Sequence, residues 1–140
     1  MRKYILLAVF SLAISTIIYS CQSATDIELA SYISNGKDVY TKYCQNCHGA
    51  NGEGLGELAP PLTDTVFLKD NKSKLACFIK NGVNEQMVIN GKTYHEKMPA
   101  FKQLENIDIA QVIVYVTNSF GNKQGMYQHQ LVENNLGECN

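Results

Sequence analysis

The chain has 140 residues, of which 45% are hydrophobic and 18% charged, with 12 basic and 13 acidic side chains. This length suits a single domain with its own core. The formal net charge of −1, with no clustered basic face, argues against nucleic-acid binding.

Residues 1–20 have the pattern of an export signal. A basic start precedes an almost uncharged apolar run from Tyr4 to Ile18, which is followed by Ser20 and Cys21. This pattern resembles a bacterial lipoprotein signal, in which cleavage falls before a cysteine that receives lipid. We expect lipid on Cys21 to anchor the exported protein to the periplasmic side of a bacterial membrane. The alternative is an uncleaved anchor, for which the run is short against a span of about 20 residues.

Removal of this segment would leave 120 residues with a formal charge of −3, because it takes away only Arg2 and Lys3 among the charged side chains. Residues 21–34 are expected to be a tether, since they are polar and have no strong apolar period. Residues 35–121 are expected to form one domain, and residues 122–140 a C-terminal extension packed on it.

A first helix is expected from Asn35 to Cys47. Val39 and Tyr43 lie four residues apart on one face, and Ser34 or Asn35 can cap the start. Gly36 weakens a helix, so its presence predicts the close approach of another helix.

The stretch Cys44-Gln45-Asn46-Cys47-His48 is typical of an attachment site for c-type haem. In such a site the two thiols form thioethers with the porphyrin and the histidine becomes an iron ligand. The alternatives are a redox dithiol and half of a zinc site. Neither is favoured, because the motif follows no βαβ pattern and no second C-x-x-C supplies further zinc ligands. We predict one covalent haem c on Cys44 and Cys47, with His48 on the iron.

The segment after this motif contains four glycines between Gly49 and Gly56. It lacks the strand-before-helix context of a phosphate loop, so a flexible turn around a cofactor edge is the preferred interpretation. Taken together, the residues from the first helix to Leu62 resemble a class I cytochrome c. The matching positions are Gly36, Val39, Tyr40, Cys44, Cys47, His48, Gly49, Gly52, Gly54, Pro60 and Leu62.

This resemblance implies an all-α fold in which three to five helices surround one covalently attached haem and the N- and C-terminal helices cross. It also implies that the Pro60 carbonyl accepts a hydrogen bond from His48 and that Leu62 packs against the haem. Helical spacing favours helices over Ser73–Asn81 and Glu105–Phe120. The β-branched residues of the second also suit a strand, and the resemblance decides for helix.

The segment Val83–Tyr94 is expected to be irregular, with a turn at Asn90–Gly91. Beyond it, the resemblance implies that Met98, which precedes Pro99, is the second axial ligand of the iron. A thioether is a soft ligand that favours ferrous iron. A core role for Met98 is the alternative, and the other candidates for the sixth position are Met87, His95, Met126 and His129.

Two cysteines remain once Cys21 is assigned to lipid and two others to haem. In an oxidising compartment we expect Cys77 and Cys139 to form a disulfide that holds the C-terminal extension to the middle of the domain. Two free buried thiols are the alternative.

An iron with both axial positions filled by protein has no open site for a substrate. The resemblance therefore implies an electron-transfer protein rather than an enzyme, which shuttles single electrons between respiratory or periplasmic redox partners. The alternatives are a haem c subunit of a larger oxidoreductase, or a five-coordinate peroxidase or sensor if Met98 is not a ligand. Four lysines would steer an acidic partner to the haem edge, unless they are ordinary surface residues: Lys42, Lys80, Lys97 and Lys102.

Overall fold

A computed structural model describes residues 2–139 of the chain, without the side chains of residues 16–23. The described chain divides after Ser31 into two compact units. Helix α1, Arg2–Tyr43, begins in the first unit and ends in the second. In this part of the chain no helix combines the length and apolarity that a membrane crossing needs. The expected lipidation site, Cys21, lies outside the described side chains.

The predicted bounds of the first helix were wrong at both ends. Helix α1 begins well before the predicted start at Asn35, so the expected tether, residues 21–34, is helical, and α1 ends at Tyr43. The chain turns at Cys44, and a separate short helix, α2, covers Gln45–His48. The second unit begins at Tyr32, and the side chain of this residue is only 8% exposed.

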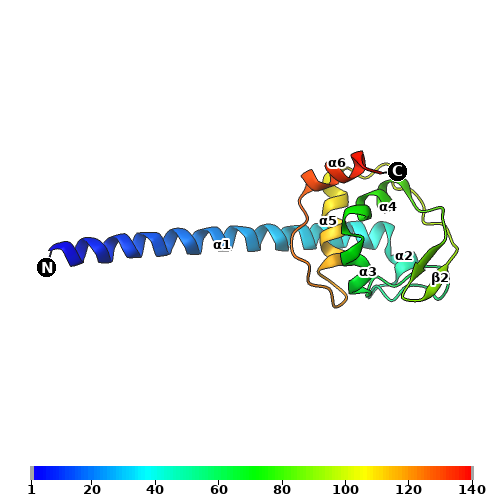
Figure 1. The fold of residues 1–140 in the computed structure, drawn as a ribbon, viewed down its shortest axis with the longest axis horizontal. Helices are drawn as coiled ribbons and strands as arrows, with labels where there is room; N and C mark the ends of the chain where they lie inside the picture. Colours follow the sequence, from blue (N-terminus) through cyan, green and yellow to red (C-terminus); the bar gives the residue numbers. More distant parts are fainter. Residues whose placement is uncertain (1, 140) are drawn as a thin grey trace. The chain divides into compact units, whose positions relative to one another are not determined.

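The predicted all-α class is confirmed, with one small hairpin added (Figure 1). The remaining elements are α3 Thr65–Asp70, a 3₁₀ turn Lys72–Lys74, α4 Leu75–Asn81, β1 Met87–Ile89, β2 Lys92–Tyr94, α5 Asn106–Thr117 and α6 His129–Gly137.

The hairpin β1–β2 lies in the segment predicted to be irregular. Its strands pair antiparallel, with Met87 opposite Tyr94 and Ile89 opposite Lys92. The predicted turn is present: Asn90 and Gly91 have φ of 52° and 74°, and both values are left-handed. Left-handed φ at both central residues is what a two-residue type I′ hairpin turn requires, and Asn-Gly is its preferred sequence.

Helix α5 supplies the centre of the core of the second unit. The Glu105 N–H donates to the Asp108 carboxylate over 3.0 Å, which satisfies a backbone group at the start of the helix. The helix is shorter than the predicted Glu105–Phe120, and most of its apolar side chains face inward. Its buried residues are Ile109, Ala110, Val112, Ile113, Val114, Val116 and Thr117.

Helices α1 and α5 cross at Gly36, as the sequence predicted. A Cβ atom placed on Gly36 would lie 2.6 Å from the carbonyl carbon of Gln111 and 2.8 Å from Cβ of Tyr115. Three aromatic rings pack beside this crossing. The centroid of Tyr40 lies 5.3 Å from that of Tyr115 and 5.4 Å from that of Phe120.

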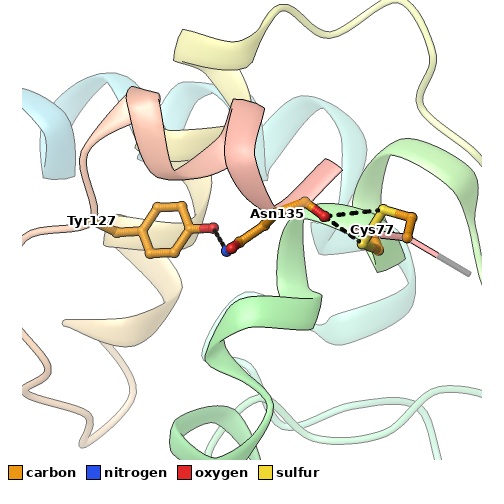
Figure 2. Close-up of a disulfide and its surroundings, with 4 residues drawn as sticks. Cys77, Tyr127 and Asn135 are labelled. Atoms are coloured by element: carbon orange, nitrogen blue, oxygen red, sulfur yellow. Dashed lines mark hydrogen bonds between the residues drawn. A yellow bond between two sulfur atoms is a disulfide. The ribbon is translucent and has the colours of Figure 1, made fainter. Parts of the chain in front are cut away.

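The C-terminal extension packs on the same unit through α6, which contacts α4 and α5 (Figure 1). Figure 2 shows how it is held. Cys139 is joined to Cys77 of α4 by a disulfide with a Cα–Cα distance of 5.7 Å. The Asn135 side-chain amide donates to the Tyr127 hydroxyl over 2.6 Å. The backbone carbonyl oxygen of Asn135 lies 3.4 Å from the sulfur of Cys77 and 3.5 Å from that of Cys139. Asn135 of α6 therefore contacts both the disulfide and Tyr127.

Candidate functional site

A cavity of about 350 Å³ lies inside the second unit, among α2, α4, α5, the hairpin and the loops between them. Its wall includes all six residues that the sequence assigned to the cofactor and its metal: Cys44, Cys47, His48, Pro60, Leu62 and Met98. The rest of its wall is mainly apolar. Side chains that form this wall include Leu68, Phe78, Ile79, Val112, Ile113 and Val116.

The helical turn α2 brings the two thiols and the imidazole together. The His48 N–H donates to the Cys44 carbonyl over 2.9 Å, so both residues belong to one turn. Cys44 and Cys47 are free thiols in this structure. Burial, and secondarily the nearby Cys47 sulfur, raise the pKa of the Cys44 thiol to about 11. The unmodified chain therefore presents a neutral thiol to the cavity at neutral pH.

The imidazole of His48 is oriented by one hydrogen bond. Its Nδ1 lies 2.9 Å from the carbonyl oxygen of Pro60. A carbonyl can only accept, so Nδ1 carries the hydrogen and the lone pair of Nε2 is left for a metal. Burial lowers the pKa of His48, while the bond to Pro60 acts in the opposite direction. The ring is thus held as the neutral tautomer that binds metals.

The glycine-rich segment is held around the motif by backbone hydrogen bonds. The Gly54 N–H donates to the His48 carbonyl over 2.8 Å, and the Leu62 N–H donates to the Gly52 carbonyl over 2.7 Å. The Tyr40 hydroxyl donates to the Gly49 carbonyl over 2.6 Å. Gly54 also has φ of +77°, and a Cβ atom there would lie 2.6 Å from the Ala59 carbonyl oxygen. Its glycine is required by the shape of the loop.

The second candidate ligand, Met98, is fixed through its backbone. Its N–H donates to the Val83 carbonyl over 2.9 Å, and its carbonyl accepts from the Val83 N–H over 3.0 Å. This pairing is possible because Gly82 has φ of +74° and a Cβ atom there would lie 2.5 Å from the Met98 carbonyl oxygen. In the sequence, Gly82 indicates only the end of a helix, and its role beside Met98 had no local signal.

The other candidates for the sixth position divide into two groups. Met87 also lines the cavity, so it remains a structural rival of Met98. His95, Met126 and His129 do not line it. The ring of His129 instead lies beside Tyr32, whose hydroxyl is 3.4 Å from Nδ1.

The four lysines expected near the haem edge have different surroundings. Lys80 donates to the Lys102 and Leu104 carbonyls over 3.0 and 2.7 Å, so its ammonium group is occupied by the backbone. Lys42 lies over the ring of Tyr43, 5.0 Å from its centroid. Lys97 lines the cavity. The ammonium groups of these lysines are therefore not equally available to attract an acidic partner.

The residues present fit a haem iron better than a zinc ion. Two thiols, a neutral imidazole and a thioether meet in a mainly apolar cavity. Among the described side chains, no group of three or more histidine, cysteine and acidic residues could hold a metal by itself. A structural zinc ion takes four such ligands, whereas a haem iron needs only two axial ones from the protein.

Comparisons with known proteins relate this chain to one family. The sequence profile of the family described as cytochrome c oxidase, cbb3-type, subunit III matches residues 31–116. Cytochrome c-552 of Thermus thermophilus is 27% identical over 97 residues, which cover 66% of this chain and 65% of that protein. The cytochrome c subunit of a quinone alcohol dehydrogenase from Gluconacetobacter polyoxogenes is 32% identical over 90 residues, covering 63% and 19%. The FixP subunit of a cbb3-type cytochrome c oxidase from Rhizobium meliloti is 35% identical over 88 residues, covering 60% and 26%. The chain thus spans just under two thirds of the first relative's length and much less of the other two.

Proposed function

We propose that this chain, which belongs to the cytochrome c family that the subunit III profile describes, is a one-electron carrier with His48 and Met98 as axial ligands. The cofactor of the family is covalently bound haem c, and this chain binds it too. When bound, haem supplies one iron that exchanges a single electron between Fe(III) and Fe(II). The observation that carries the proposal is the meeting of Cys44, Cys47, His48 and Met98 at one apolar cavity.

Each of these side chains has a separate task. Cys44 and Cys47 hold the porphyrin covalently, so the small domain does not depend on packing alone to retain it. The hydrogen bond from His48 to Pro60 makes the imidazole a stronger ligand. The thioether of Met98 favours the ferrous state, and its clamped backbone keeps the sulfur at the cavity.

Like the thioether of Met98, the apolar wall of the cavity favours the ferrous state of the iron. Phe78, Ile113 and Val116 give the cavity apolar surface, and an apolar surrounding disfavours the more highly charged ferric state. With both axial positions filled, the protein offers the iron no place for a substrate. Electron transfer without bond making is the chemistry that remains.

The ligand assignment is tested by the visible spectrum of the oxidised protein. Methionine bound to ferric iron gives a weak long-wavelength band. We expect this band in the wild type and in Met87→Ala, and its loss in Met98→Ala. Met87→Ala is the matched control, because both methionines line the cavity. Loss of the band in Met87→Ala with its retention in Met98→Ala would contradict the assignment.

We further propose that the chain is exported, that Cys21 carries lipid, and that the domain works at the periplasmic face of a membrane between a respiratory donor and an acceptor. The apolar run before Cys21 supports this. Metabolic labelling with a radioactive fatty acid tests it: label on the wild type and none on Cys21→Ser is expected. Equal labelling of the two proteins would contradict it.

A second candidate function is a subunit permanently docked on a larger oxidoreductase. Two of the relatives are named as such subunits, one of a quinone alcohol dehydrogenase and one of a cbb3-type oxidase. Gentle solubilisation of the membrane followed by affinity purification separates the two functions. A free carrier is recovered alone, whereas a subunit brings its complex with it.

A further inference from the structure

We propose that Asn122, the first residue of the C-terminal extension, is a positioning residue for the loop whose Pro60 carbonyl orients His48. Through that loop it lowers the reduction potential of the iron. The inference rests on the proposed function in one respect, namely that His48 is an axial ligand. It assigns to the start of the extension a role at the cofactor, beyond packing on the domain.

Asn122 is buried, with 2% of its surface exposed. Its side-chain amide nitrogen donates to two carbonyl oxygens, that of Leu62 over 2.9 Å and that of Val116 over 3.0 Å. Because both partners can only accept, the nitrogen of the amide must face them. Asn122 therefore ties the end of α5 to a loop 60 residues earlier in the chain.

Leu62 is held on both sides by this arrangement. Its carbonyl accepts from Asn122, and its N–H donates to Gly52 over 2.7 Å. Only Pro61 separates it from Pro60. The ring of Pro61 fixes its own φ and restricts Pro60 to extended conformations. A shift of Leu62 is therefore transmitted to the Pro60 carbonyl, which lies 2.9 Å from Nδ1 of His48.

The chain reversal after α5 places Asn122 at this point. Phe120 and Gly121 have φ of 55° and 91°, both left-handed, and the Asn122 N–H donates to the Ser119 carbonyl over 2.8 Å. The ring of Phe120 covers the same loop, since a Cβ atom on Gly52 would lie 2.6 Å from it. A left-handed phenylalanine is strained, and such strain is kept where the surrounding structure requires it. The chain reversal thus packs the ring of Phe120 on the loop and anchors the loop through the amide of Asn122.

The consequence for the iron has a definite sign. A hydrogen bond from Nδ1 increases the negative character of the imidazole, and a more basic ligand stabilises ferric iron. Asn122→Ala leaves the Leu62 carbonyl without its donor and loosens the loop. The bond between His48 and Pro60 then weakens, and the reduction potential rises.

Asn118→Ala is the matched control. Like Asn122, Asn118 donates its side-chain amide to two carbonyls, those of Val114 and Gly125, each over 2.8 Å. It also accepts from the Gly125 N–H over 2.8 Å. These bonds join α5 to the extension and do not reach the loop of Pro60. Removing the Asn118 amide therefore destabilises the same region but leaves the hydrogen bond between Asn122 and Leu62 in place.

The experiment is a spectroelectrochemical titration of the full-length haem-loaded wild type, Asn122→Ala and Asn118→Ala. We expect a resolved upward shift of the midpoint potential in Asn122→Ala and no shift in Asn118→Ala, with the methionine–iron band kept in all three. An unchanged potential in Asn122→Ala, or equal shifts in the two variants, would overturn the inference. Absence of the band from the wild type would instead count against the proposed ligand set, so the two failures are distinguishable.

A second measurement uses the wild type alone, so it does not depend on whether a variant folds. In the ferrous wild type, hydrogen exchange followed by nuclear magnetic resonance should show protected side-chain amide hydrogens at Asn122. Asn134 is exposed in α6 and supplies the unprotected reference. Exchange at Asn122 as fast as at Asn134 would refute the anchor on Leu62.

Discussion

Replacing Gly36 with alanine tests the crossing of α1 and α5. The added methyl group would meet the carbonyl group of Gln111, with the carbonyl carbon at 2.6 Å, and Cβ of Tyr115 at 2.8 Å. Ordinary van der Waals contact begins near 3.4 Å. The atoms in the way belong to the backbone and the first side-chain carbon of α5, so a rotamer change cannot make room. One helix must move.

The expected loss of stability is the difference between two opposing effects. Alanine is more favourable than glycine within a helix by about 1 kcal/mol. Inserting a methyl group into a closely packed contact costs about 1–3 kcal/mol. Because a whole helix has to shift, the upper end of that range applies, about 3 kcal/mol. The free energy of unfolding should therefore fall by about 2 kcal/mol once the helix preference of alanine is subtracted.

The assay is denaturant unfolding of the haem-loaded protein, with the midpoint and slope compared between variants. Gly137→Ala is the control, since Gly137 is the last residue of α6 and nothing lies within 4 Å of an added Cβ atom. It should leave stability unchanged or raise it by up to about 1 kcal/mol. If Gly36→Ala were as stable as the wild type or more stable, the close crossing of the two helices would be refuted.

Three further changes have definite expected outcomes. Tyr40→Phe keeps the aromatic packing but removes the 2.6 Å hydrogen bond to the Gly49 carbonyl. The free energy of unfolding, measured by thermal unfolding, should fall by about 1–2 kcal/mol. An unchanged melting temperature would contradict this. Replacing Cys77 and Cys139 together with serine opens a loop with a sequence separation of 62 and should lower the free energy of unfolding by about 4 kcal/mol. With the iron kept ferrous in both proteins throughout, a thiol reductant should bring the wild type to the same value and leave the variant unchanged. Gly82→Ala and Gly91→Ala both place alanine at φ of +74°, but only the first meets the carbonyl oxygen of the proposed distal ligand, at 2.5 Å. Only the first should weaken the methionine–iron band, and equal weakening in both would show that backbone strain alone is responsible.

The proximal half of the site could be predicted from the sequence because its geometry is local. Two cysteines three residues apart and the next histidine fall within about one turn where the chain is helical, and α2 with its N-cap Cys44 places them so. The distal half is different in kind. Met98 reaches the cavity through its pairing with Val83, a contact that no spacing encodes. The sequence predicted Met98 through the resemblance to a family, and Gly82, which makes the pairing possible, was missed.

Two differences between the predicted and the observed elements have physical explanations. The first helix was predicted to begin only at Asn35, because residues 21–34 have no apolar period, but such a period reports a buried face and not helix formation itself. That segment contains good helix formers such as Glu28, Leu29 and Ala30. The hairpin strands are only three residues long, too short for alternation to be read. The role of Asn122 depends on a partner 60 residues away, and no local pattern indicates it.

The central claim is that a single haem iron in this chain carries one electron and has both axial positions filled by His48 and Met98. A spectroelectrochemical titration of the wild type, run under nitrogen and then under carbon monoxide, tests it most directly. Carbon monoxide binds ferrous haem wherever an axial position is open. We expect a reversible one-electron transition with the same midpoint under both gases. A higher midpoint under carbon monoxide would show an open position and contradict the claim.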